Sequence, residues 1–220
     1  MACALCLPHV LDAQAPAQRP PGPYVVDLHG AMSGIPSAAP FYPPVPTGTT
    51  IASRGFGFDV GGHVLPLRLG GARLGVGASL MRVRGTATGT SATLQVLAPQ
   101  ISFNFGSADG WSYLSVGLGT ARVRTEATAP ATAPTATAAG AADAASTTIA
   151  TAAAIQETTR KSPSVSSLNA GGGARWFVTS HLAVGFDVRL YRLAAGSGDE
   201  THAATPRTTL VAASVGLSVR

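Results

Sequence analysis

Charge is scarce in this chain. Charged residues make up 11% of the 220 residues, against about 25% in an ordinary soluble domain, while hydrophobic residues make up 45%. A surface so poor in charge is hard to keep in water. The net charge of +5 comes from arginine, because Lys161 is the only lysine. These arginines are expected to scatter over strand ends, which argues against nucleic acid as a partner and favours anionic lipid head groups or aspartates inside the protein.

Long apolar runs are also missing. No stretch approaches the roughly 20 residues that a membrane-spanning helix needs, so apolar residues are spread at period two. The remaining membrane structure is a closed β-barrel, since an open sheet would leave backbone groups unpaired in lipid. One barrel would use most of the chain and leave no room for a second domain.

Cysteine is confined to Cys3 and Cys6, near the N-terminus. Residues 1–17 are apolar and end in small-residue patterns, which predicts a truncated signal peptide without its basic start. Residues 18–23 form a proline-rich spacer. The mature protein would then contain no cysteine.

The rest of the chain alternates between apolar and small or polar residues. In residues 24–34, for example, Val26 and Leu28 share one face while Asp27 and His29 share the other. The first face suits lipid and the second suits a lumen. The pattern predicts an all-β fold, an eight-stranded antiparallel up-and-down transmembrane β-barrel, with strands at about residues 24–34, 51–65, 73–80, 92–106, 111–124, 165–178, 182–191 and 207–220.

Long and short connections are expected to alternate along these strands. Residues 66–71 and 107–110 read as tight turns, and residues 126–163, almost all Ala, Thr, Pro and Ser, read as a mobile external loop. Pro99 predicts a bulge or local break within its strand, because proline cannot donate to the ladder.

Aromatic residues gather near the short turns, as an interfacial girdle requires. The predicted girdle consists of Tyr24, Phe103, Phe105, Trp111, Trp176 and Phe177. We expect that rim, and both termini, to be periplasmic.

The chain resembles the small eight-stranded outer-membrane β-barrel superfamily, which includes the OmpA transmembrane domain and OmpX. The resemblance covers residues 24–220 and is carried by strand patterns such as WSYLSVGLG at 111–119 and LVAASVGLSV at 210–219. It implies a bacterial outer-membrane location, contact with outer-membrane lipids and the barrel-assembly machinery, and a monomer.

Polar residues on the inward faces predict a lumen network. Its expected members are Asp27, His29, Arg54, Asp59, His63, Arg175, Asp187 and Arg189. Asp27, His29, Asp59 and His63 have side chains that could bind a divalent metal, and His29 and His63 with Ser33 or Ser79 could suggest acyl transfer. No serine on a strained turn and no oxyanion-hole motif accompanies them, so we predict no catalytic residue, metal or cofactor.

The function expected from these features is structural: membrane anchoring, or surface contact through the long loops, without a wide pore. One alternative is a lipid-modifying enzyme or small-lipophile transporter, which needs a polar cluster open to lipid. A soluble lipocalin-like barrel is the other, and the near-absence of Lys and Glu on strand faces argues against it.

Overall fold

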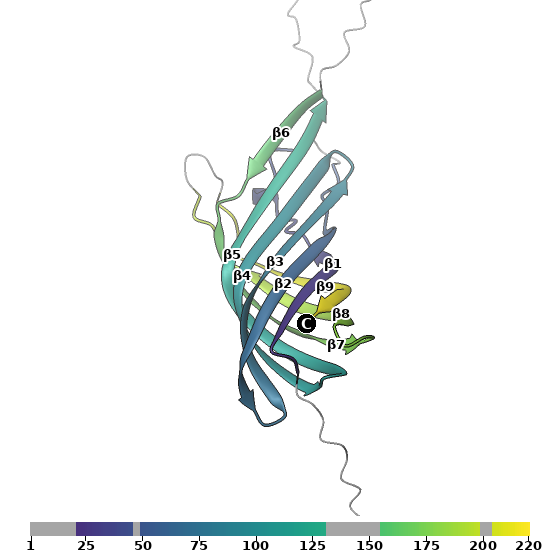
Figure 1. The fold of residues 1–220 in the computed structure, drawn as a ribbon. Helices are drawn as coiled ribbons and strands as arrows, with labels where there is room; N and C mark the ends of the chain where they lie inside the picture. The colour runs from purple at the N-terminus through teal and green to yellow at the C-terminus, as the bar shows by residue number, and fades with distance from the viewer. Residues whose placement is uncertain (1–20, 46–48, 131–154, 199–203) are drawn as a thin grey trace, which may run out of the picture.

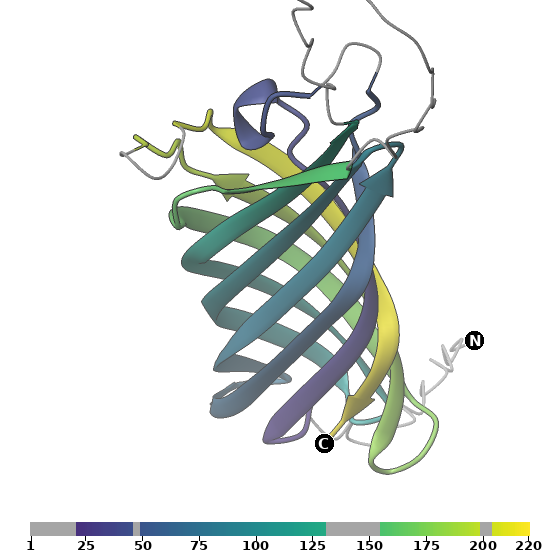
Figure 2. The same cartoon turned by 90° about the horizontal axis from the view of Figure 1, so that it is seen from above.

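The computed structural model describes residues 21–45, 49–130, 155–198 and 204–220, so the predicted signal peptide lies outside the described residues. The chain forms one closed antiparallel barrel, because β1 pairs with both β2 and β9 (Figures 1 and 2). The strands are β1 (Tyr24–Gly34), β2 (Arg54–Leu69), β3 (Ala72–Ala87), β4 (Thr90–Ser107), β5 (Gly110–Pro130), β6 (Ile155–Lys161), β7 (Val165–Phe177), β8 (Leu182–Leu193) and β9 (Thr208–Val219). Eight of them close the wall, and β6 extends it beside β5, which confirms the predicted fold class.

The two ends of the barrel differ. The connections at 70–71, 108–109 and 178–181 lie at the end that also holds the C-terminus, as Figure 2 shows. Gly70 adopts a φ of 61° in the first of them, a conformation that favours glycine. We call this the turn end and the opposite one the loop end.

One connection at the loop end is not long. β3 and β4 are joined by two residues, Thr88 and Gly89, and pair without interruption from Ala72↔Phe105 to Ala87↔Thr90. The prediction of strict alternation between long and short connections was therefore wrong at this point. The predicted strands stopped too early because the outward residues here, such as Arg82 and Arg84, are polar.

The predicted loop at 126–163 also contains strand. β5 continues to Pro130, and β6 pairs with it from Arg124↔Lys161 to Pro130↔Ile155. Only residues 131–154 of that segment lie outside the described part of the chain. Ladder pairing needs backbone groups alone, so the Ala- and Thr-rich end of β5 can pair with β6.

Two prolines shape the wall differently. Pro66 lies in β2, where the register with β3 shifts between Val64 and Leu67, so the predicted turn at 66–71 starts with a bulge and more strand, and the turn itself is confined to residues 70–71. At Pro99 the register with β5 is unchanged, but Ala98 and Pro99 have no partner there. The predicted irregularity is thus a local break in the ladder and not a bulge.

No helix in the described residues is long and apolar enough to cross a membrane.

The faces of the wall exchange character along the barrel axis. Toward the turn end, outward residues are apolar and inward ones polar, as in Leu28 and His29. Beyond Leu80 the pattern inverts, because Met81 and Val83 are buried inside while Arg82 and Arg84 point outward. The outward apolar residues form a belt around the wall; it includes Val26, Leu28, Val60, Leu97, Leu114, Leu118, Phe186, Val188 and Leu217.

Candidate functional site

The lumen holds the main concentration of polar side chains, and its centre is a buried ion pair. Arg175 on β7 donates from Nε and Nη2 to the two carboxylate oxygens of Asp27 on β1, at 2.8 and 2.6 Å. Ser218 on β9 donates to Asp27 Oδ1 at 2.6 Å. Arg175 is only 1% exposed, so this bidentate pair, with Ser218, ties three strands together inside the barrel.

A second ion pair lies beside the first. Arg189 donates to both oxygens of Asp187 at 2.7 and 3.1 Å, and Tyr113 donates to Asp187 Oδ2 at 2.7 Å. The guanidinium of Arg175 lies 3.9 Å from the centroid of the Tyr113 ring, which links the two pairs. A Cβ on Gly171 would lie 2.5 Å from Arg189 Cγ, so glycine at this position makes room for the arginine.

The predicted histidines and Asp59 line the space between these pairs. His29, Asp59 and His63 are 3%, 8% and 5% exposed, and His29 Nδ1 lies 3.3 Å from Ser214 Oγ. With the ion pairs they surround a cavity of about 10 Å³. That volume accommodates about one water molecule and no organic substrate.

The structure does not bring together the residue sets considered for metal binding or acyl transfer in the part of the chain that it describes. Within the described residues, no group of three His, Cys, Asp or Glu side chains could hold a metal ion. The hydroxyl of Ser33 donates to the Gly34 carbonyl, and that of Ser79 accepts from Gln100 at 2.6 Å. The two serines considered for acyl transfer are therefore engaged with groups other than histidine.

One predicted member of the network lies outside the barrel. Arg54 is exposed on the same face of β2 as Phe56 and Phe58, because residues two apart in a strand share a face. The sequence reasoning also missed Tyr113, Gln100 and Asn169, all buried in the lumen. Their inward positions followed from the alternation, but uncharged side chains gave no further signal.

Aromatic and cationic groups fill the turn end of the lumen. Trp111 is 2% exposed and packs against Phe177 in a tilted arrangement with ring centroids 4.8 Å apart. The guanidinium of Arg220 lies 3.8 Å from the Phe177 centroid, and its Nε donates to the Ser180 carbonyl at 2.8 Å. Trp111 and the half-buried Phe177 are thus not girdle residues, since they share the inward face with Tyr113 and Arg175 respectively. The other predicted members, Tyr24, Phe103, Phe105 and Trp176, are 40–55% exposed on the outer wall.

The connection between β1 and β2 fills the loop end of the lumen. It contains a short 3₁₀ turn, η1 (Ala39–Phe41), visible at the loop end in Figure 2, and it buries Phe41 and Tyr42 to 3% and 2% exposure. Thr125 Oγ1 donates to the Phe41 carbonyl at 2.5 Å, and Arg160 donates to the Tyr42 carbonyl at 2.6 Å. Burial raises the pKa of Tyr42 to about 12. The proline-rich sequence predicted a loop but not that it folds inward.

Three fillings therefore succeed one another along the lumen: aromatic and cationic at the turn end, ionic in the middle, apolar at the loop end. The apolar one includes Ile35, Phe41, Met81, Val83, Leu94, Val96, Val123, Tyr191 and Leu193. Within the described residues, side chains thus occupy the lumen at all three levels.

No family model matches the sequence, and no characterised protein matches it by sequence. Solved structures do match the fold. The chain is similar to Neisserial surface protein A, with a TM-score of 0.50 and 14% identity over 90% of this chain and 97% of that one. It also matches Ail, the attachment invasion locus protein of Yersinia pestis (TM-score 0.46, 12% identity, 89% and 96% covered), and the outer membrane protein OprG from Pseudomonas aeruginosa (0.43, 8%, 92% and 97%). With its wall closed by eight antiparallel strands, the chain has the fold of the small outer-membrane β-barrels.

Proposed function

We propose that this protein is an integral barrel of a bacterial outer membrane whose role is structural: anchoring, or surface contact through its loop end. The outward apolar belt carries the proposal. Phe56, Leu28 and Leu118 are 67%, 61% and 71% exposed, and apolar side chains so exposed around a whole wall need lipid around them.

The closed lumen supports anchoring over transport. Buried ion pairs and two end fillings leave a cavity of only about 10 Å³ at the centre. In this proposal the barrel-assembly machinery inserts a monomer, the turn end and both termini face the periplasm, and no catalytic step is involved.

The test is to refold the chain from Gln18 in a neutral detergent. We expect a β-rich far-UV spectrum and a gel mobility that changes on boiling, followed by no large channel current in planar bilayers. A folded, monodisperse species in detergent-free buffer would instead support the lipocalin-like alternative. Large, steady currents would overturn the closed-lumen role.

A groove on the belt favours the small-lipophile alternative as a second candidate. It lies on the outer surface of the wall, at the break in the ladder near Pro99, and has a volume of about 480 Å³. Its lining consists mainly of Val76, Ile101, Val116, Leu118 and Leu168. Leu118→Trp would partly fill this groove. Transport predicts slower uptake of an apolar fluorescent probe into vesicles that carry the variant, whereas anchoring predicts no difference from empty vesicles with either protein.

A further inference from the structure

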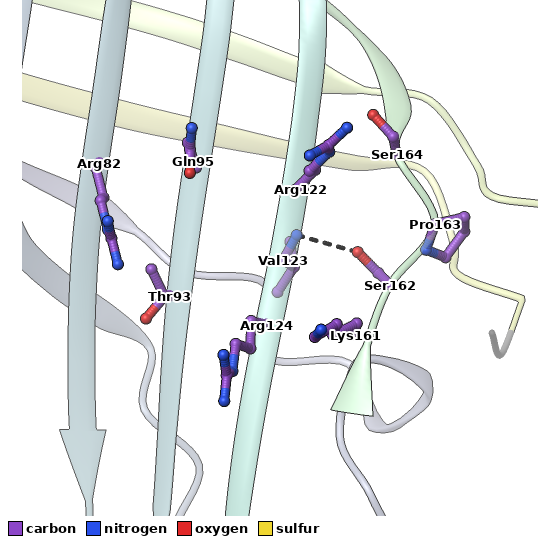
Figure 3. Close-up of a pocket in the computed structure, with 10 residues that line it drawn as sticks. All are labelled: Arg82, Thr93, Gln95, Arg122, Val123, Arg124, Lys161, Ser162, Pro163 and Ser164. Carbon is purple, nitrogen blue, oxygen red and sulfur yellow. Dashed lines mark hydrogen bonds between the residues drawn. The ribbon is translucent and has the colours of Figure 1, made fainter. Parts of the chain in front are cut away.

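Cationic side chains gather on one outer face of the wall, contrary to the scattering expected from the sequence. Arg82 on β3, Arg122 and Arg124 on β5 and Lys161 at the end of β6 line a concavity of about 650 Å³ (Figure 3). The bend at Ser162 bounds it, held by a bond from Val123 N to Ser162 Oγ at 3.1 Å. Arg84, on the same face of β3, extends the group, which we call the basic face.

The strand register sets the height of the basic face. Leu80 lies opposite Leu97, and both belong to the outward face at the edge of the apolar belt. Two residues farther along each strand toward the loop end, the next outward-facing row contains Arg82, which lies opposite Gln95, and Gln95 lies opposite Arg122. The outward-facing row after that, which we call the outer row, contains Arg84, Thr93, Arg124 and Lys161. Consecutive rows are about 7 Å apart along the strand, so on β3 and β4 the polar rows follow directly after the last apolar one, while on β2 the exposed Phe58 and Phe56 lie opposite Arg82 and Arg84.

The two cations nearest the belt, Arg82 and Arg122, and Lys161 in the next row differ from the other two in having no acidic partner among the described residues. Glu126 accepts from Arg84 at 2.9 Å and lies 3.2 Å from Arg124 Nε, both in the outer row. In the described part of the chain, no carboxylate lies within ion-pair distance of Arg82, Arg122 or Lys161. Arg82 and Arg122 are about 10 Å apart across β4, with the Gln95 amide between them.

We infer that the basic face binds phosphorylated head groups of the lipid leaflet that surrounds the loop end. Guanidinium groups bind phosphate oxygens through paired N–H donors, and the site opens sideways into the head-group layer instead of toward the solvent above the barrel. The charge is complementary, and the belt directly beneath would hold the acyl chains of the same lipid. The inference rests on the proposed membrane insertion.

The test compares lipid binding by the full chain in neutral maltoside detergent, measured by native mass spectrometry with phosphatidic acid and with phosphatidylcholine of equal chain length. We expect preferential retention of phosphatidic acid. A cation at a membrane surface contributes roughly fivefold in affinity, so Arg82→Gln with Arg122→Gln should weaken binding about twentyfold. The matched control, Arg68→Gln with Arg192→Gln, removes the same charge from exposed sites elsewhere and should change binding less than about twofold.

Equal binding by the two double variants would overturn the inference. Displacement of phosphatidic acid by an equal concentration of inorganic phosphate would also overturn it, by assigning the site to a soluble anion. Flotation with phosphatidylcholine vesicles keeps the two proposals apart. A protein that floats but shows no phosphatidic acid preference refutes the basic face alone, whereas one that fails to float refutes membrane insertion.

Discussion

Single carboxylates decide how the lumen is organised. Asp27 accepts hydrogen bonds from Arg175 and Ser218 at once, and Asp187 accepts them from Arg189 and Tyr113. A buried ion pair adds little to stability compared with an apolar pair of equal shape, but removal of one partner leaves an uncompensated charge. The pairs therefore favour one arrangement of strands over others.

Asp27→Asn should lower the free energy of unfolding by about 3–5 kcal/mol, because it strands the Arg175 guanidinium in the interior. Urea unfolding in lipid vesicles measures this change. Asp109→Asn, in the exposed turn between β4 and β5, is the control and should shift the midpoint little. An unchanged midpoint for the Asp27 variant would show that the pair does not hold the lumen.

Glu126 lies beyond the apolar belt and should titrate at low pH. A hydrogen bond from Ser91 and the nearby Arg84 and Arg124 lower the pKa of its carboxyl. The stability it adds is fully present above the ordinary glutamate pKa and is lost as pH falls through the lowered value. A carbon-detected NMR titration should give a midpoint below the ordinary glutamate range, and Arg84→Gln should raise it. A midpoint at the ordinary value would contradict this pairing.

Strand parity could be read from the sequence and was the better guide to single residues. It placed Asp27, His29, Asp59, His63, Arg175, Asp187 and Arg189 inside, as the structure does. Parity also groups Trp111 with Tyr113, Phe177 with Arg175 and Arg54 with Phe56, so these three errors came from expectations about aromatic and charged residues that ignored it. Partners such as Tyr113 for Asp187 depend on strands 74 residues apart and could not be read locally.

At the scale of the element, the connection that contains η1 acts as a plug in the loop end of the lumen. Its apolar residues meet Met81, Leu94 and Val123, which are inward-facing and belong to the part of the wall where the faces are inverted. This arrangement explains why the loop-end parts of β3 and β4 were not predicted as strand. Their apolar residues serve an internal core, so the outward face there has the polar composition of a loop.

Phe41→Ala should weaken the packing of this plug and lower the free energy of unfolding by about 3–4 kcal/mol, as for other buried phenylalanines. Hydrogen exchange should quicken at the loop end of β4 and β5 and stay slow near Asp27. Ser37→Ala, an exposed position in the same loop, is the control. Uniformly faster exchange along the barrel would show that the plug does not unfold separately from the rest of the barrel.

At the scale of the whole molecule, the belt is short. On β8 the outward apolar side chains run from Leu182 to Leu190, before Arg192. That is about 27 Å along the strand and about 21 Å along the barrel axis at a tilt of about 40°. We therefore expect this part of the wall to fit a thin bilayer; on β2 the exposed apolar residues extend farther, from Phe56 to Leu69.

Refolding yield should be highest in vesicles of lipids with 12-carbon chains and fall in those with 18-carbon chains, because the thicker bilayer leaves polar rows such as Arg82 in hydrocarbon. Boiling-dependent gel mobility measures the yield. Equal yields across chain lengths would mean that the belt does not set the fit.

The paired extension of β5 and β6 has a consequence for protein engineering. The register Pro130↔Ile155 brings the two ends of segment 131–154 together on a ladder that is joined to the barrel by β5. We expect a guest peptide inserted between Pro130 and Ile155 to be tolerated, because the ladder holds these two residues side by side and each doubling of the length of a flexible connection costs only about 0.6 kcal/mol. Foreign epitopes of varied size can thus be carried on the cell exterior there without redesign of the barrel, if the loop end faces outward.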